Sequence, residues 1–150
     1  MYHLATLYPW FGRVRLPITR DQAALLLAAA NQVFLGIDIW LAHSINHHFT
    51  SGEMIPIVFG PTAGLALLVA GIVAIRWRPA AAAFANVVFL ASGVVGVMGV
   101  IFHLERAGLP TGSLTARFTT KLLVWGPPFL GPMMFVLIAL WGMSAAWEET

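Results

Sequence analysis

The stretch QAALLLAAANQVFLGIDIWLAHSIN, residues 22–46, decides the fold class because it is apolar over almost its whole length. A hydrocarbon core of about 30 Å is crossed by about 20 helical residues. Residues 54–76, 80–104 and 128–147 form three further segments of this kind. The whole chain of 150 residues is 59% hydrophobic and 9% charged, with a mean hydropathy of +0.84, and this composition excludes an ordinary soluble domain.

We therefore predict an all-α integral membrane protein whose four transmembrane helices form an antiparallel up-down bundle, a single four-span domain over residues 1–150. The connections are short except for residues 105–127, so sequential packing is the simplest topology. Thr19, followed three residues later by Gln22, fits a capping box and marks the start of the first span. Residues 1–20 mix apolar and aromatic side chains with arginines and are expected to lie at the membrane interface.

The positions of Lys and Arg indicate the orientation in the membrane. Five fall at the end of the spans that holds the N-terminus, three fall at the other end, and the loop between the first two spans has none. Because cytoplasmic loops are enriched in Lys and Arg, we expect both termini to be cytoplasmic in a bacterial-type inner membrane. The first group is Arg13, Arg15, Arg20, Arg76 and Arg78, and the second is Arg106, Arg117 and Lys121.

The chain has no cysteine, which excludes disulfides, thiolate zinc sites, iron–sulfur clusters and cysteine-attached haem. Any cofactor must therefore be held by histidine, carboxylate or methionine. His43 and His103 stand near the ends of the first and third spans, which run in the same direction, so both are expected at similar depth near the outer side. In a four-helix square these two spans lie diagonally, about 14 Å apart, a separation that two imidazoles on one metal can bridge.

One interpretation of this pair is a b-type haem bound between His43 and His103. Gly96 and Gly99 would then form a notch beneath its ring, and Arg106 would lie near its propionates. The alternative for the glycines is helix packing alone, because glycine lets any two membrane helices approach closely.

A second interpretation is a compact metal site for copper, zinc or iron. His43 and His47 are four residues apart and share a helical face, and His48 and Glu53 fall near the same boundary. Histidines at a membrane boundary also occur without any ligand, since the ring tolerates a half-hydrated position.

Asp38 is the least expected residue of the first span, because an isolated carboxylate in hydrocarbon is costly unless it is paired, hydrated or protonated. Asn31 precedes it by seven residues on the same helical face. A proton path or ion site and a hydrogen bond to another helix are both open for Asp38, and one polar stripe of this helix is expected to face a neighbouring subunit.

These residues predict a small membrane subunit of a redox or energy-converting complex, holding a haem b or another histidine-ligated metal near the extracytoplasmic side. Any catalytic role would be electron transfer within that complex. The alternative is a cofactor-free structural subunit that packs within a larger membrane assembly, including a pigment–protein assembly. The expected partners are lipids and other membrane subunits or further copies of the chain, with a quinone as an additional candidate and no nucleic acid.

Overall fold

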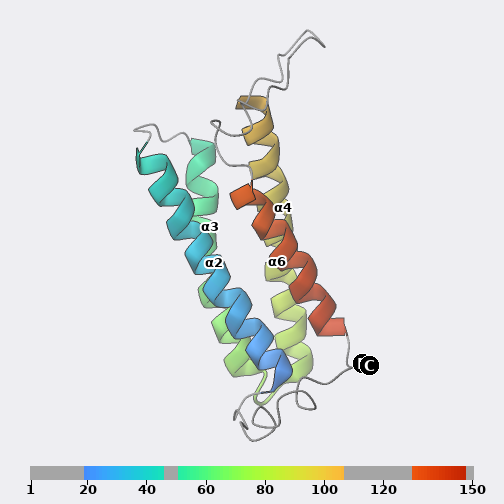
Figure 1. Cartoon of the computed structure of the whole chain (residues 1–150). Helices are drawn as coiled ribbons and strands as arrows, with labels where there is room; N and C mark the ends of the chain where they lie inside the picture. The colour runs from blue at the N-terminus through green and yellow to red at the C-terminus, as the bar shows by residue number, and fades with distance from the viewer. Residues whose placement is uncertain (1–18, 46–50, 107–129, 148–150) are drawn as a thin grey trace, which may run out of the picture.

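The computed structural model describes residues 19–45, 51–106 and 130–147, which form four helices and no strand (Figure 1). They are α2 (Arg20–Ile45), α3 (Ser51–Val73), α4 (Arg78–Arg106) and α6 (Leu130–Trp147). Three helical stretches are long and apolar enough to cross a membrane, namely Asp21–Ile45, Ser51–Val73 and Arg78–Leu104. The apolar helix Leu130–Ala145 is shorter. The all-helical, membrane-type prediction is confirmed at this level, while the segment before residue 19 and the predicted start of the fourth span at residue 128 lie outside the described residues.

The predicted start of the first helix is confirmed by its capping box. The Thr19 backbone N–H donates to Gln22 Oε1 at 3.0 Å, and the Gln22 backbone N–H donates to Thr19 Oγ1 at 3.3 Å. This reciprocal pair satisfies two of the backbone donors that a helix N-terminus leaves open.

The second helix is displaced from its predicted range of 54–76 and spans Ser51–Val73. Its first turn contains Glu53, whose negative charge is favourable near a helix N-terminus, so polar residues that resembled a loop in the sequence are helical. At its other end the chain turns tightly, with the Arg76 N–H donating to the Val73 carbonyl at 3.0 Å. Pro79 then lies in the first turn of α4, where proline is tolerated.

The four helices form a ring in which α2 packs on α3, α3 on α4, α4 on α6, and α6 on α2 (Figure 1). The helices α2 and α4 therefore lie on a diagonal. Contacts between α2 and α3 pair Gly36 with Pro61 and Ala29 with Gly64, so these two helices run in opposite directions. Helices α4 and α6 are related in the same way, because Gly96 contacts Val136 while Gly142 contacts Phe89.

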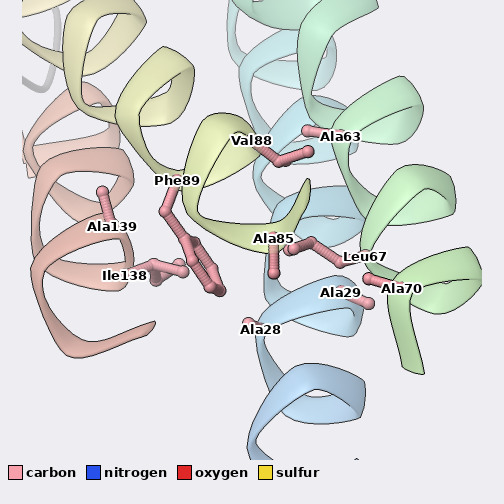
Figure 2. Packing of buried hydrophobic residues seen from close by; sticks show 10 residues of the cluster. All are labelled: Ala28, Ala29, Ala63, Leu67, Ala70, Ala85, Val88, Phe89, Ile138 and Ala139. Carbon is pink, nitrogen blue, oxygen red and sulfur yellow. The ribbon is translucent and has the colours of Figure 1, made fainter. Parts of the chain in front are cut away.

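Small side chains dominate the interior, and Figure 2 shows how they let the helices approach. In membranes, helix association depends on such close van der Waals packing. Lipid tails are as apolar as the side chains, so burying a side chain against another helix gains no hydrophobic free energy. Phe89 of α4 fills the space toward Ile138 and Ala139 of α6, while Leu67 of α3 lies toward Ala85 of α4 (Figure 2). The complete cluster comprises Ala28, Ala29, Ala63, Leu67, Ala70, Ala85, Val88, Phe89, Ile138 and Ala139.

Candidate functional site

Two histidines lie at the end of the ring of helices formed by the C-termini of α2 and α4. His43 Nδ1 is 2.7 Å from the Ile39 carbonyl oxygen, and His103 Nδ1 is 2.8 Å from the Gly99 carbonyl oxygen. A carbonyl oxygen only accepts, so Nδ1 carries the proton in each ring and donates it one helical turn back. A neutral imidazole held in this way presents the lone pair of Nε2, which is the arrangement of many metal-binding histidines.

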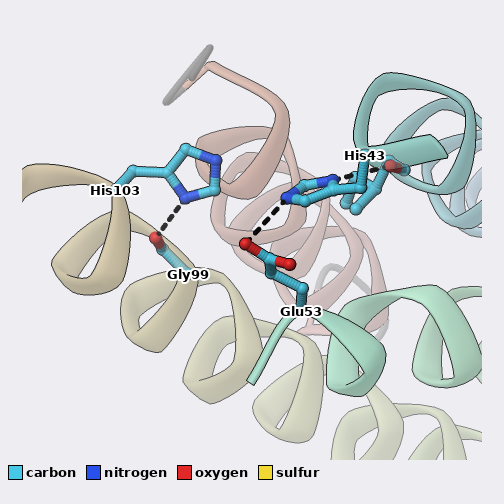
Figure 3. A network of polar contacts seen from close by, with 5 residues as sticks. His43, Glu53, Gly99 and His103 are labelled. Carbon is cyan, nitrogen blue, oxygen red and sulfur yellow. Dashed lines mark hydrogen bonds and ion pairs between the residues drawn. The ribbon is translucent and has the colours of Figure 1, made fainter. Parts of the chain in front are cut away.

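The two rings are close neighbours although they belong to diagonally placed helices. Their centroids are 6.2 Å apart and their planes meet at 82°. Glu53, from the first turn of α3, places Oε1 3.8 Å from His43 Nε2, and the side chains of His43 and Glu53 are only 14% and 11% exposed. Figure 3 shows the His43 ring reaching from α2 toward Glu53 and His103. Three helices thus contribute two imidazoles and one carboxylate to a single, largely buried cluster.

The separation of the rings can be compared with that required by a metal. Metal–nitrogen bonds of about 2.0–2.1 Å place two Nε2-bound imidazoles with centroids about 6 Å apart when they lie on opposite sides of the ion, and about 5 Å apart in a tetrahedral site. The observed spacing falls at the upper end of this range. In their present arrangement, however, no three His, Asp or Glu side chains of the described residues form a group that could hold a metal ion.

Gly96 and Gly99 face α6. A Cβ at position 96 would lie 2.8 Å from the Pro132 carbonyl oxygen and 2.7 Å from Val136 Cγ2, and one at position 99 would lie 2.7 Å from Pro132 Cβ. The faces of these glycines are therefore occupied by another helix. This contact corresponds to the packing alternative, which explains both glycines without a flat ligand.

The remaining residues of the predicted metal and haem sites are only partly described. His47 and His48 lie outside the described residues. Arg106 is the last residue of α4, and its side chain is not among those described. The structure therefore places His43, His103 and Glu53 together and leaves the roles of the other three as predictions.

Asp38 and Asn31 lie away from the histidine cluster. Asp38 is exposed on the outer side of α2. Asn31 is half-buried and donates from Nδ2 to the Leu27 carbonyl at 2.8 Å. The buried side of the same helix contains Gln32, Gly36 and Ile39, so the two polar stripes expected for this helix point in different directions.

A polar pair in the centre of the helices was not singled out from the sequence. Gln32 Nε2 donates to Ser92 Oγ at 2.8 Å, and Ser92 Oγ donates to the Val88 carbonyl at 2.9 Å; both side chains are fully buried. Gln32 Oε1 has no hydrogen-bond partner among the described residues. The sequence signal was present, since Gln32 shares a helical face with His43 and Ser92 shares one with His103.

A cavity of about 590 Å³ lies at the opposite end of the helices from the histidines. It opens between the start of α2, the turn joining α3 and α4, and the end of α6, and its lining includes Asp21, Gln22, Arg78, Phe89 and Ala145. The cavity shares no residue with the histidine cluster, so the two features are separate.

Comparison with models of known protein families, with curated proteins and with solved structures finds no match. The function must therefore be argued from the residues of this chain.

Proposed function

We propose that this chain is a small membrane subunit of a redox or energy-converting complex and that it binds a metal through His43 and His103. The observation that supports the proposal most directly is the meeting of two imidazoles from diagonal helices at 6.2 Å, each with Nδ1 bonded to a carbonyl of its own helix. That bond fixes the tautomer and ring orientation that a metal requires at Nε2. Electron transfer suits such a centre, because the surrounding apolar helices exclude water.

The composition of the cluster favours a metal ion over a haem b. Glu53 brings a carboxylate to within 3.8 Å of His43 Nε2, and two imidazoles with a carboxylate are suitable ligands for copper, iron or zinc. A porphyrin between the same two histidines would require Glu53 to withdraw and would gain no space from Gly96 or Gly99, which already contact α6. A b-type haem is therefore the less favoured ligand, and its optical bands would identify it.

In the proposed membrane arrangement, all four helices span the bilayer, residues 1–20 lie at its surface, and both termini are cytoplasmic in a bacterial-type inner membrane. Arg20, Arg76 and Arg78 lie at one end of the helices, as expected for cytoplasmic boundaries. The exposed ring of Trp40 lies one turn before His43 and suits the opposite interface. The metal site would then lie near the extracytoplasmic side, where the expected partners are lipid, a neighbouring subunit or a quinone.

The proposal is tested by loading the purified full-length protein with Cu²⁺, Zn²⁺ or Fe²⁺ and measuring bound metal by elemental analysis, together with oxidised and reduced optical spectra. We expect about one metal per chain and a rise in unfolding temperature with metal, since a ligand that binds only the folded state stabilises it by about 2.7 kcal/mol at 100 times Kd. His43→Ala and His103→Ala should each abolish both effects, and Glu53→Gln should weaken them.

Ser44→Ala is the matched control, because Ser44 neighbours His43 and donates only within its own helix, to the Leu41 carbonyl at 2.8 Å. It should bind metal like the unchanged chain. Metal binding that survives His103→Ala would refute the proposed ligand pair. His47→Ala and His48→Ala identify the ligands in that case.

A cofactor-free structural subunit is the second candidate, and the close glycine contacts favour it. Gly60 and Gly64 of α3 approach the backbone of α2 as Gly96 approaches that of α6, a pattern that small residues produce in purely packing interfaces. Absence of bound metal, of haem bands and of metal-dependent stabilisation would establish this candidate in place of the first.

A further inference from the structure

Helix α2 has an outward face with a regular spacing that is not used in packing among the four described helices. Residues on this face are separated alternately by four and three positions in the sequence. This is the heptad pattern by which two parallel helices pack against each other. The helix turns its buried residues, such as Ala28, Gln32 and Ile39, to the opposite side. We call this outward face the α2 seam; it comprises Leu27, Asn31, Phe34, Asp38, Leu41 and Ile45.

Five of the six residues of the α2 seam are exposed, and Asn31 is half-buried. Leu27 is 55% exposed, Phe34 69% and Ile45 75%, and the Asp38 side chain is exposed as well. Among the outward-facing residues that the structure describes in the three membrane-length helices, Asp38 is the only carboxylate lying away from a helix end. A carboxyl group facing lipid at that position is unfavourable, so the seam needs a partner in the membrane.

A second copy of this chain satisfies both polar residues of the seam. Copies inserted in the same orientation are related by a two-fold axis along the membrane normal, so each seam residue meets its own counterpart at the same depth. An asparagine amide both donates and accepts, and two carboxyl groups can share one proton, so Asn31 and Asp38 are each able to pair with themselves. A polar residue at such a heptad position also fixes the register of the pair.

The positions of the Lys and Arg residues also favour pairing with a second copy. Between Asp21 and Ile45, between Ser51 and Val73, and between Pro79 and Leu104, the described helices contain no Lys or Arg. These stretches therefore offer no cation to neutralise Asp38, whereas a second copy of the chain brings a carboxyl group to the same depth.

We propose that the α2 seam is the surface through which two copies of this chain associate as a parallel, symmetric dimer, with Asn31 and Asp38 paired across the axis. This interaction is independent of the proposed metal site. His43 lies on α2 outside the seam, and each copy keeps its own His43, His103 and Glu53.

The absence of cysteine allows a direct test by single-cysteine cross-linking of the full chain in lipid vesicles at a high lipid-to-protein ratio. Phe34→Cys and Leu41→Cys lie on the seam. Ile37→Cys, on the same helix but off the seam, and Val94→Cys, on the outer face of α4, are controls with 45% and 60% exposure. A short bis-maleimide reagent avoids adding copper to a protein that is itself a candidate metal binder.

We expect several-fold more cross-linked dimer at positions 34 and 41 than at 37 and 94. In the Leu41→Cys background, Asp38→Leu should reduce the dimer several-fold and Asp38→Asn should retain it. Equal cross-linking at all four positions, no dimer at any position, or an unchanged yield with Asp38→Leu would each overturn the proposal. All of these substitutions lie on exposed faces, and an unchanged unfolding temperature verifies that each variant is folded.

Discussion

Replacing Gly60 by alanine adds a single methyl group at the closest approach of α2 and α3. That Cβ would lie 2.6 Å from the Gln32 carbonyl oxygen, 2.8 Å from Gly36 Cα and 2.9 Å from Gly36 N. All three are backbone atoms, so no side chain can rotate away to make room. Because non-bonded carbon atoms prefer about 3.5–4.0 Å, the two helices must separate by about 1 Å.

Such overpacking costs about 1–3 kcal/mol. For a chain of 150 residues, each kcal/mol changes the unfolding temperature by about 2–4 °C. We therefore expect Gly60→Ala to lower the unfolding temperature by about 2–12 °C. The six tryptophans of the chain provide the fluorescence signal for thermal unfolding in detergent micelles.

Gly71→Ala is the matched control on the same helix, since a Cβ at position 71 meets nothing within 4 Å. Alanine is also the better helix former, by up to about 1 kcal/mol in water. The unfolding temperature of Gly71→Ala should therefore be the same as that of the unchanged chain or higher. If Gly60→Ala and Gly71→Ala unfold at the same temperature, the close contact does not determine the stability of this helix pair and the reasoning fails.

Three further substitutions test the core and the first helix. Ser92→Ala removes the acceptor of Gln32 Nε2 and should cost about 0.6 kcal/mol, the average coupling for interhelical hydrogen bonds in a membrane protein, and at most about 1.7 kcal/mol. A double-mutant cycle with Gln32→Leu should return that coupling, and a value near zero would contradict it. Thr19→Val removes the side-chain acceptor of the capping box and should cost about 1 kcal/mol, seen as faster amide exchange in the first turn of α2. Leu67→Ala, at a fully buried position, should cost about 2–5 kcal/mol, whereas Leu65→Ala, 61% exposed on the same helix, should change the unfolding temperature little.

The existence of the helices followed directly from hydropathy, because 20 or more apolar residues have few alternatives to a membrane-type helix. The start of α2 also followed from the sequence, since the side chains of Thr19 and Gln22 satisfy local backbone donors without any help from the rest of the chain. The start of α3 was misplaced by three residues, because Ser51, Gly52 and Glu53 are polar enough to resemble a loop.

The sequence predicted the part of the candidate site that depends only on how far along the helices each residue lies. His43 and His103 were expected at one level because their helices run in the same direction, and their rings do lie together. The partner of each glycine could not be predicted, because a helical wheel gives the face of a residue but not the helix that covers it. Gly96 and Gly99 consequently fitted a ligand notch as well as they fitted the α6 contact that they make.

At the α2–α3 contact, Gly36 of α2 lies against Pro61 of α3. Pro61 lacks the N–H that would bond to the Ile57 carbonyl four residues earlier. That carbonyl lies 3.2 Å from the position a Cβ of Gly36 would take, and Pro61 Cδ lies 2.5 Å from the same point. The absence of a side chain at position 36 therefore lets α2 approach both the proline ring and the Ile57 carbonyl closely.

These contacts divide the protein into two tightly packed helix pairs, α2 with α3 and α4 with α6, each held by glycines against backbone. The Gln32–Ser92 hydrogen bond joins the pairs midway along the helices. His43 and Glu53 belong to the first pair and His103 to the second, so the candidate metal site lies across the boundary between the pairs. A metal bound there would connect the two helix pairs, which the glycine contacts do not join. Its binding should therefore raise the stability of the whole chain. Loss of His103 alone should remove that gain, because the second pair would then have no ligand in the site.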